Sequence, residues 1–359
     1  MKITIILGTR PEIIKMSPII RECEKRNLNY FILHTGQHYS YEMDRIFFSD
    51  LELPDAKYNL DVGSGLHGEQ TGRMLTGIES VLIKEQPDVV LVEGDTNTVL
   101  AGALAASKLH IKVGHVEAGL RSYDRSMPEE INRILTDHIS DCLFAPTNIS
   151  KQNLVQEGIP EEMIYVVGNT IVDATIQNIE IAKNKSAMLN HLDIKPNHYF
   201  LITLHRAENV DKKTRLKEIL TSFELLSNEY ELPLIFPIHP RTMKRIKEFN
   251  LESKLNIDLL NIIKPVGYLD FLILESNASL ILTDSGGVQE EACILNTPCV
   301  TLRDNTERPE TINVESNVIA GCNPAKILKS VEIMFNKEKS WTNPFGDGKS
   351  AEKITSILL

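Results

Sequence analysis

The sequence predicts an α/β protein built from two Rossmann-like, doubly wound domains that face a cleft. Short apolar runs alternate with amphipathic stretches along nearly the whole chain, which is typical of parallel strands joined by helical crossovers. The 359 residues exceed what one hydrophobic core usually supports, so two domains are expected. Unusual polar motifs follow several strand candidates, and the ligands of such sheets bind beyond the carboxyl ends of the strands.

The strand and helix candidates divide into two similar halves. In the first half we expect strands at residues 3–7, 30–34, 88–93, 112–117, 142–145 and 165–167, with helices at 12–25, 69–84, 98–107 and 130–139. In the second half we expect strands at 200–204, 234–238, 257–262, 280–283 and 299–302. The break falls near Gly168 and Asn169, before a helix at 171–183. Residues 1–168 should therefore form an N-terminal Rossmann-like domain and residues 169–344 a C-terminal Rossmann-like domain.

Composition excludes several classes of protein. The 38 basic and 49 acidic residues give a net charge of −11, so neither nucleic acid nor an anionic membrane is an expected partner. Five scattered cysteines form no CxxC pair, which indicates neither a zinc site nor a disulfide framework. The apolar run at the N-terminus is too short for a signal peptide or a membrane span, so we expect a cytoplasmic protein.

The sequence DSGG at residues 284–287 is the clearest candidate for a phosphate site. It follows a strand candidate and opens a helix, where glycines leave backbone N–H groups and the positive end of the helix dipole open to an anion. The alternative is that Ser285 only caps the helix.

The sequence GTRPE at residues 8–12 forms a second corner between a strand and a helix. Arg10 and Lys15 place two cations there, either as phosphate contacts or as solvated surface charges. No GxGxxG motif follows this strand, so no nicotinamide or other dinucleotide cofactor is expected.

Three carboxylates follow strands or open a helix in the first half, namely Asp95, Glu117 and Glu129. Gathered in one site, they would suit acid–base catalysis, because repulsion and burial raise the pKa of at least one member. The alternative is structural. Asp95 and Glu129 would then be helix caps, and Glu117 would pair with Arg121.

His205 follows the first strand of the second half and could bind phosphate, move a proton or only space a loop. Residues 303–310 carry Arg303 and Arg308 beside acidic residues, which could bind ribose or phosphate or form a solvated loop. No histidine has a partner at metal-ligand spacing, so no metal is expected.

Taken in order, these segments resemble the non-hydrolysing UDP-N-acetylglucosamine 2-epimerases along essentially the whole chain. Short pieces such as SGG are weak evidence alone, whereas the ordered set is highly specific. The matching segments are GTRPE at 8–12, GDT at 94–96, HVEAGLR at 115–121, PEE at 128–130, HR at 205–206, DSGGVQEE at 284–291, TERPE at 306–310 and NPFGDG at 343–348.

The resemblance implies a fold, partners and site residues. The fold would be GT-B-like, with a C-terminal helix at about 345–359 packing back on the first domain. The assembly would be a homodimer. UDP-N-acetylglucosamine and UDP would be the ligands. Their contacts would be Arg10, Lys15, Phe271, Ser285, Gly286, Gly287, Glu291 and Arg308, and the catalytic residues would be Asp95, Glu117, Glu129 and His205.

The implied reaction eliminates UDP to give 2-acetamidoglucal and adds UDP back, converting UDP-N-acetylglucosamine to UDP-N-acetylmannosamine for polysaccharide precursors. Gln37, Arg206 and His239 match part of a site at which a second substrate molecule activates bacterial members, and Glu69 stands where those members often carry Arg. The rival interpretations are a GT-B glycosyltransferase, a hydrolysing epimerase and a catalytically silent nucleotide-sugar sensor.

Overall fold

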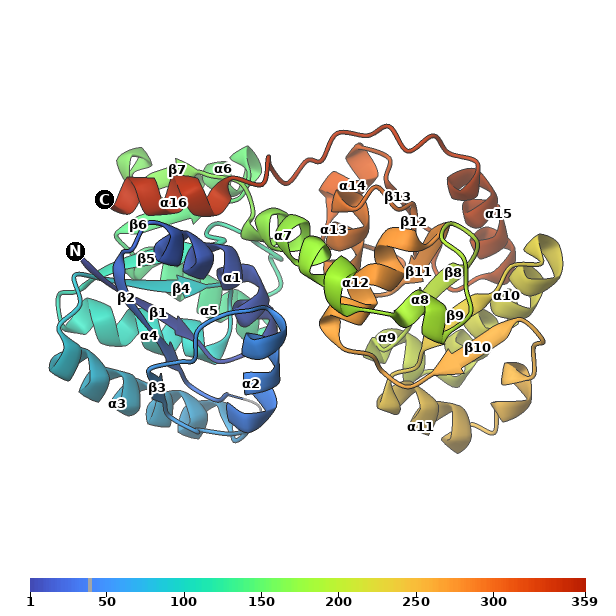
Figure 1. Cartoon of the computed structure of the whole chain (residues 1–359), viewed down its shortest axis with the longest axis horizontal. Helices are drawn as coiled ribbons and strands as arrows, with labels where there is room; N and C mark the ends of the chain where they lie inside the picture. Colours follow the sequence, from blue (N-terminus) through green and yellow to red (C-terminus); the bar gives the residue numbers. More distant parts are fainter. Residues whose placement is uncertain (38–40) are drawn as a thin grey trace. The chain divides into compact units, whose positions relative to one another are not determined.

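The computed structural model describes residues 1–37 and 41–359, which form two compact units. Unit 1 comprises Met1–Gln177 together with Phe345–Leu359, and unit 2 comprises Asn178–Pro344. Each unit contains one parallel sheet with helices interleaved between its strands (Figure 1). The predicted fold class, two Rossmann-like α/β domains, is confirmed.

The sheet of unit 1 has the strand order β3-β2-β1-β4-β5-β6-β7. Its strands are β1 (Lys2–Leu7), β2 (Asn29–His34), β3 (Tyr58–Asn59), β4 (Val89–Glu93), β5 (Lys112–Val116), β6 (Cys142–Ala145) and β7 (Ile164–Val166). Its helices are α1 (Arg10–Lys25), α2 (Tyr41–Asp50), α3 (His67–Glu85), α4 (Asn97–Lys108), α5 (Pro128–Ile139), α6 (Asn148–Gln156) and α16 (Ser350–Leu358), with α7 (Thr170–Lys185) crossing to unit 2.

Strands β1 and β4 are apolar on both faces because helices cover both faces of the sheet. Small residues let α4 approach closely. A Cβ on Gly102 would lie 3.0 Å from Val92 and 3.2 Å from Ile6. This close packing fixes the first turn of α4 beside the carboxyl ends of β1 and β4.

The sheet of unit 2 has the strand order β10-β9-β8-β11-β12-β13. Its strands are β8 (Phe200–Thr203), β9 (Leu234–Pro237), β10 (Leu260–Ile263), β11 (Leu280–Thr283), β12 (Cys299–Thr301) and β13 (Asn317–Ile319). Its helices are α8 (Met188–His191), α9 (Ala207–Val210), α10 (Lys213–Tyr230), α11 (Pro240–Glu248), α12 (Tyr268–Asn277), α13 (Gly286–Ile294), α14 (Pro309–Asn313) and α15 (Pro324–Phe335).

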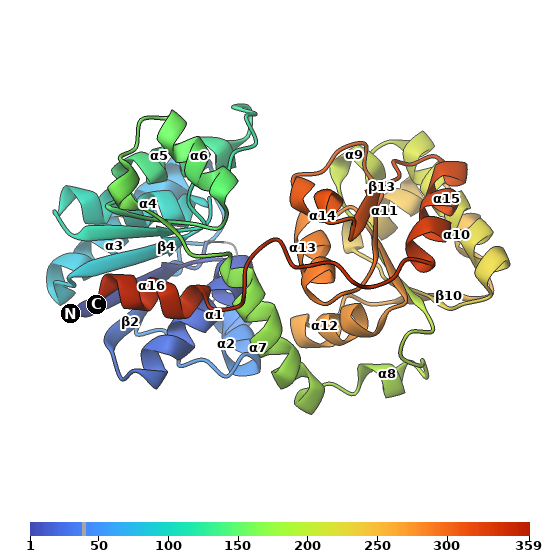
Figure 2. The same ribbon diagram turned by 90° about the horizontal axis from the view of Figure 1, so that it is seen from above.

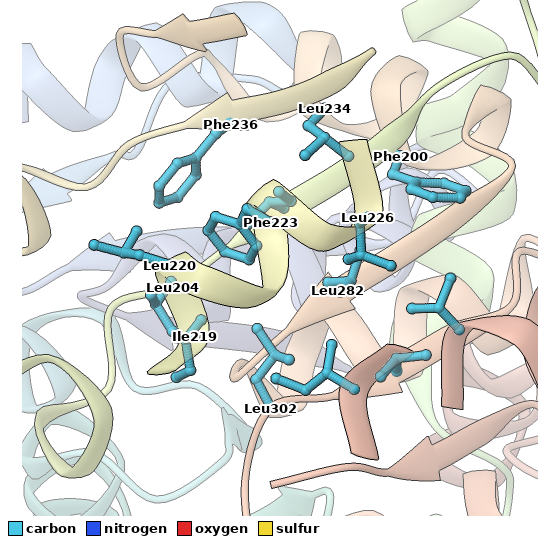
Figure 3. Close-up of a cluster of buried hydrophobic side chains, with 14 of the residues drawn as sticks. Phe200, Leu204, Ile219, Leu220, Phe223, Leu226, Leu234, Phe236, Leu282 and Leu302 are labelled. Carbon is cyan, nitrogen blue, oxygen red and sulfur yellow. The ribbon is translucent and has the colours of Figure 1, made fainter. Parts of the chain in front are cut away.

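The amphipathic helix α10 lies against the sheet of unit 2. Ile219, Leu220, Phe223 and Leu226 recur at helical spacing and are fully buried with side chains of β8, β9 and β11 (Figure 3). Burying a side chain of this size stabilises the fold by about 1.5–3 kcal/mol. This core holds β8 and β11 as neighbours, and the candidate nucleotide residues follow these two strands.

The last segment of the chain returns to unit 1 (Figure 2). The Asp173 carboxylate accepts hydrogen bonds from the backbone N–H groups of Ser350 and Ala351, at the start of α16. Arg26 at the end of α1 donates to Ser356 in the same helix. Since the first turns of α7 also hold this segment, contacts divide the chain after Gln177, beyond the residue 168 expected from the sequence.

The sequence analysis did not identify several short or polar elements. It omitted β3 and β13, which have two and three residues, and it omitted α2 and α15. The strand expected at 257–262 begins only at Leu260, because η2 (Glu252–Leu255) and a turn precede it. None of the helices in residues 1–37 and 41–359 has the length and hydrophobicity that a membrane-spanning helix requires.

Candidate functional site

The candidate residues of both units lie where the strand order reverses. In unit 1 this switch point separates β1 from β4, and in unit 2 it separates β8 from β11. The chain leaves these neighbouring strands in opposite directions, which opens a crevice at their carboxyl ends. The segments after all four strands therefore form the candidate site regions of the two units.

Lys15 pairs with two buried carboxyl groups in unit 1. Its Nζ lies 2.5 Å from Oε2 of Glu117 and 3.1 Å from Oε1 of Glu93. The other oxygen of Glu117 accepts a hydrogen bond of 3.2 Å from the side-chain amide of Asn169. Both carboxyl groups are buried. Lys15 is thus committed to a buried acid pair, and its interpretation as a solvated surface cation is wrong.

Backbone geometry explains how Glu117 leaves β5. Its φ is +69°, a left-handed conformation that glutamate seldom adopts and that functional sites often contain. Gly119 follows with φ +81°, and a Cβ there would lie 2.3 Å from the carbonyl oxygen of Ser150. The turn after β5 is therefore restricted to one shape, which points the Glu117 carboxylate toward Lys15.

A buried polar network supports this turn. The Asp137 carboxylate on α5 binds His115 Nδ1 at 2.7 Å, Arg121 Nη1 at 2.7 Å and the backbone N–H of Gly119. The other ring nitrogen of His115 lies 2.8 Å from the carbonyl oxygen of Gly94. Because Arg121 pairs with Asp137 and also with Glu157, the alternative pairing of Arg121 with Glu117 is wrong.

Asp95 and Glu129 occupy different environments. The Asp95 carboxylate pairs with Arg133 on α5, and that arginine also pairs with Glu130. Glu129 is exposed in the first turn of α5, and no ion pair among the described residues involves it. The structure therefore joins Asp95 to Arg133 and Glu117 to Lys15, and it leaves Glu129 open to solvent.

Neither Asp95 nor Glu129 is a helix cap. The N-cap of α4 is Thr96, whose hydroxyl accepts from Val99, and the N-cap of α5 is Met127. The capping interpretation of these two carboxylates is therefore wrong, which leaves their charges available for other roles.

Glu12 organises the corner between β1 and α1. Its carboxyl group accepts from the backbone N–H groups of Gly8 and Thr9 and from the hydroxyl of Thr96. Burial raises the pKa of Glu12 to about 7, although these hydrogen bonds oppose the shift. Arg10, at the start of the helix, lies with its guanidinium 4.8 Å from the centre of the Phe47 ring, a cation–π arrangement.

In unit 2, Asp284 fixes the segment that contains His205. The fully buried Asp284 carboxylate accepts from the backbone N–H groups of His205 and Arg206 and from the Asn209 amide. It also lies 3.3 Å from Nδ1 of His205. Burial lowers the pKa of His205, and the nearby Arg206 adds to the effect while Asp284 opposes it. His205 is thus an oriented imidazole biased toward its neutral form.

The start of α13 has the geometry of an anion site. Ser285 is the N-cap residue, as the capping interpretation expects, but its side chain makes no cap hydrogen bond. Gly286 and Gly287 form the first turn, whose N–H groups have no acceptor within the helix. An added Cβ on Gly287 would meet no atom within 4 Å. The backbone here is accessible to an oxyanion, which the helix dipole favours.

Cations surround the start of α13. Arg308 Nε lies 2.7 Å from Glu290 in the same helix, and Arg206 lies 3.7 Å from Glu307. Arg303 pairs with both Glu307 and Glu208. The segment 303–310 is therefore built into an ion-pair network, and its interpretation as a purely solvated loop is wrong.

Glu291 and Phe271 lie farther along the same region. Glu291 is buried in α13, and its charge raises the pKa of Tyr268 on α12, for which burial is the largest cause. Burial, with Glu291 second, likewise raises the pKa of Glu275 well above its ordinary value. Phe271 packs against the apolar cluster between α12 and the sheet. The Glu291 carboxyl group comes from α13 and the Phe271 ring from the neighbouring helix α12.

The four candidates for an activator site have distinct environments. In unit 1, the Gln37 carbonyl Oε1 accepts from the N–H and hydroxyl of Thr98, and the exposed Glu69 lies 3.7 Å from Arg73. In unit 2, His239 is the N-cap of α11, and its ring lies 5.7 Å from that of His205; Arg206 pairs with Glu307 as described above.

Sequence reasoning missed two parts of the site. Glu93 ends β4, and nothing in its local sequence distinguishes it from other strand-end acids. A buried amide network in which Asn97 binds both Gln70 and Asn132 also escaped notice. Among the described residues, no group of three or more His, Cys, Asp or Glu side chains could hold a metal ion.

Comparisons with known proteins agree on one family. The family model described as UDP-N-acetylglucosamine 2-epimerase matches residues 21–359. A Methanocaldococcus jannaschii protein named UDP-N-acetylglucosamine 2-epimerase is 65% identical over 362 residues, covering 100% of this chain and 99% of the relative.

Solved structures give the same result. The Methanocaldococcus jannaschii UDP-GlcNAc 2-epimerase in complex with UDP-GlcNAc and UDP is similar with a TM-score of 0.87 and 64% identity, covering 100% of this chain and 99% of that one. The Neisseria meningitidis UDP-GlcNAc 2-epimerase bound to UDP-GlcNAc gives 0.88 and 36%, with the same coverage.

Proposed function

The chain belongs to the UDP-N-acetylglucosamine 2-epimerase family, and we propose that it interconverts UDP-N-acetylglucosamine and UDP-N-acetylmannosamine without hydrolysing either. The observation that carries this proposal is the buried triad of Lys15, Glu93 and Glu117 at the switch point of unit 1. A protein that only binds a nucleotide sugar has no need for a buried carboxylate oriented in this way, whereas proton transfer at carbon requires a positioned acid–base group such as Glu117.

The chemistry starts from a weakly acidic C2–H bond. A base takes the C2 proton, the C–H electron pair forms the C1–C2 double bond of 2-acetamidoglucal, and UDP leaves with the C1–O pair. In the return step, UDP adds to C1 and a proton reaches C2 from the opposite face. One acid–base group is needed on each face, together with cations for the departing diphosphate.

Unit 1 supplies the acid–base groups in this proposal. Glu117, oriented by Lys15 and Asn169, Asp95, oriented by Arg133, and Glu129 are the candidates for the two faces of the sugar. The geometry supports Glu117 most strongly, since its carboxyl group is buried and held from both oxygens. Arg10 would contact the nucleotide sugar from unit 1.

Unit 2 supplies the UDP contacts. The backbone of Gly286 and of the exposed Gly287 after Ser285 would hold the diphosphate with Arg308, and Glu291 would bind the ribose hydroxyls. Phe271 would contact the uracil. His205, biased toward the neutral form, would donate a hydrogen bond near the leaving oxygen.

The proposal also includes an activator site, an oligomeric state and a cellular role. Gln37, Arg206 and His239 would form an activator site for a second UDP-N-acetylglucosamine, which Glu69 would weaken by placing a carboxylate near a diphosphate. The family resemblance also supports a cytoplasmic homodimer that supplies precursors for cell-surface polysaccharide.

The direct test is incubation of the protein with UDP-N-acetylglucosamine and separation of the products. We expect UDP-N-acetylmannosamine to accumulate without added nicotinamide cofactor. Free N-acetylmannosamine with stoichiometric UDP would indicate a hydrolysing enzyme. Transfer of the sugar to an added acceptor would indicate a glycosyltransferase, and binding without turnover would indicate a sensor.

A further inference from the structure

Glu93 is a buried carboxyl group that contacts Lys15 and is not one of the proposed acid–base groups. It ends β4, its side chain is 2% exposed, and its register partner on β5 is Val116, the residue before Glu117. The parallel pairing of β4 and β5 therefore delivers two carboxyl groups side by side to one lysine. Lys15 reaches both from α1, which follows β1, the other neighbour of β4.

Two buried carboxyl groups lie against one ammonium group. The Nζ of Lys15 contacts both Glu93 and Glu117, and the buried Glu12 adds a further acidic group nearby. Neighbouring β5 contributes His115, whose ring nitrogens bond to Asp137 and to the carbonyl oxygen of Gly94. Two ionised carboxylates held side by side in a buried site repel each other, so a shared proton between the two acids lowers the energy of the pair.

The direction of the titration agrees with this repulsion. Burial is the largest cause that raises the pKa of Glu93 well above its ordinary value; the charge of Glu117 and a hydrogen bond between the two side chains add to it, and Lys15 opposes it. The two groups titrate as a pair. One proton therefore stays on the pair in the range where an isolated glutamate is ionised.

We propose that Glu93 is a positioning residue that holds this proton against Glu117. The shared proton keeps the Glu117 carboxylate oriented for proton transfer at the sugar and limits the pair to one negative charge. This inference rests on the proposed function. When Glu117 accepts the C2 proton on one face of the sugar, the pair passes from one proton to two. The acid–base group on the opposite face then protonates C2, and the pair returns to one proton by releasing its second proton to solvent. Lys15 keeps its charge throughout, and Glu93 needs no contact with the substrate.

The test compares Glu93→Gln with Glu93→Leu. Glutamine retains a neutral hydrogen-bond donor beside Glu117, so kcat should stay within about tenfold of the unchanged protein. Leucine leaves Glu117 without that partner, so kcat should fall about 10²-fold, as expected for a misplaced catalytic group, with KM nearly unchanged. A Glu93→Leu variant with unchanged kcat would overturn the proposal.

The pH profile separates this role from a purely structural one. In the unchanged protein, kcat should fall as pH rises through the upper ionisation of the pair, because the second charge removes the orienting hydrogen bond. That fall should disappear in Glu93→Gln. Glu12 is also buried and its pKa is about 7, so its ionisation could cause the same fall of kcat. The Glu12→Gln variant separates the two groups, because the fall must persist in that variant if the Glu93–Glu117 pair is responsible. Its persistence in Glu93→Gln would show that the proton lies elsewhere.

A readout without activity keeps this test distinct from that of the proposed function. A raised pKa in the folded state means that the folded protein binds the proton more tightly than the unfolded chain. The associated stability is present below the unfolded pKa and is lost as pH rises through the folded pKa. Glu93→Gln should therefore flatten the decline of Tm with pH. If that variant does not fold, Glu117→Gln should also flatten the decline of Tm with pH, because Glu93 would then ionise beside Lys15. An unchanged decline would overturn the proposal.

Discussion

Replacing Glu117 with glutamine is expected to lower kcat by about 10²–10⁴-fold, the usual contribution of a general acid–base group, while the Kd for UDP stays nearly unchanged. The substitution keeps the size and the polar contacts of the side chain, and it removes the group that exchanges a proton. Lys15 and Asn169 hold this carboxylate from both oxygens, so its position is defined before substrate arrives. Steady-state kinetics and UDP titration measure the two effects separately.

Glu161→Gln is the matched control, because Glu161 is exposed and pairs only with Lys151 among the described ion pairs. It should leave kcat within about twofold, since surface pairs contribute little. A Glu117→Gln variant that retains near-normal kcat would remove Glu117 from the acid–base groups. Asp95 and Glu129 would then be the remaining candidates, tested by the same amide substitutions.

Gly287→Ala is expected to make the protein slightly more stable and yet to weaken UDP binding. The added Cβ meets no atom within 4 Å in the protein, and Gly→Ala at a compatible helical position stabilises by about 0.4–1 kcal/mol. If the diphosphate lies against this turn, the methyl group occupies its space. Overpacking of this kind costs about 1–3 kcal/mol, or about 5- to 150-fold in Kd. Calorimetric titration with UDP and thermal unfolding measure both changes.

Gly72→Ala provides the control, since Gly72 lies within α3 and its added Cβ also meets no atom within 4 Å. It should raise Tm in the same way and leave UDP affinity unchanged. Equal UDP affinity in Gly287→Ala and the unchanged protein would show that the diphosphate does not bind at the start of α13.

The fold was predictable because its determinants are local. Apolar runs that end at a glycine or an acidic residue, such as the run before Gly94, predicted the strands. The turn at Pro11 predicted the start of α1 to within two residues. Elements stabilised mainly by their surroundings were missed. The two-residue strand β3 forms because it pairs with the edge of β2. Two residues are too few to show a strand periodicity in the sequence.

The site was predictable where a motif has a required backbone shape, as at Gly286 and Gly287. It was not predictable where partners come from distant segments. Sequence proximity suggested Arg121 for Glu117, but the partner is Lys15, which reaches it from α1. Glu93 acquires its importance only through the register of β4 against β5. Sheet register and side-chain direction together decide such contacts, and neither is visible in a single motif.

The exchange of hydrogen at C2 tests the central claim most directly. The protein is incubated with UDP-N-acetylglucosamine in heavy water, and the recovered nucleotide sugars are analysed by proton NMR and mass spectrometry. Elimination and re-addition predict UDP-N-acetylmannosamine that carries one deuterium at C2, because the carboxyl groups that return the proton exchange with solvent. UDP-N-acetylmannosamine that retains its original hydrogen at C2 would contradict the account.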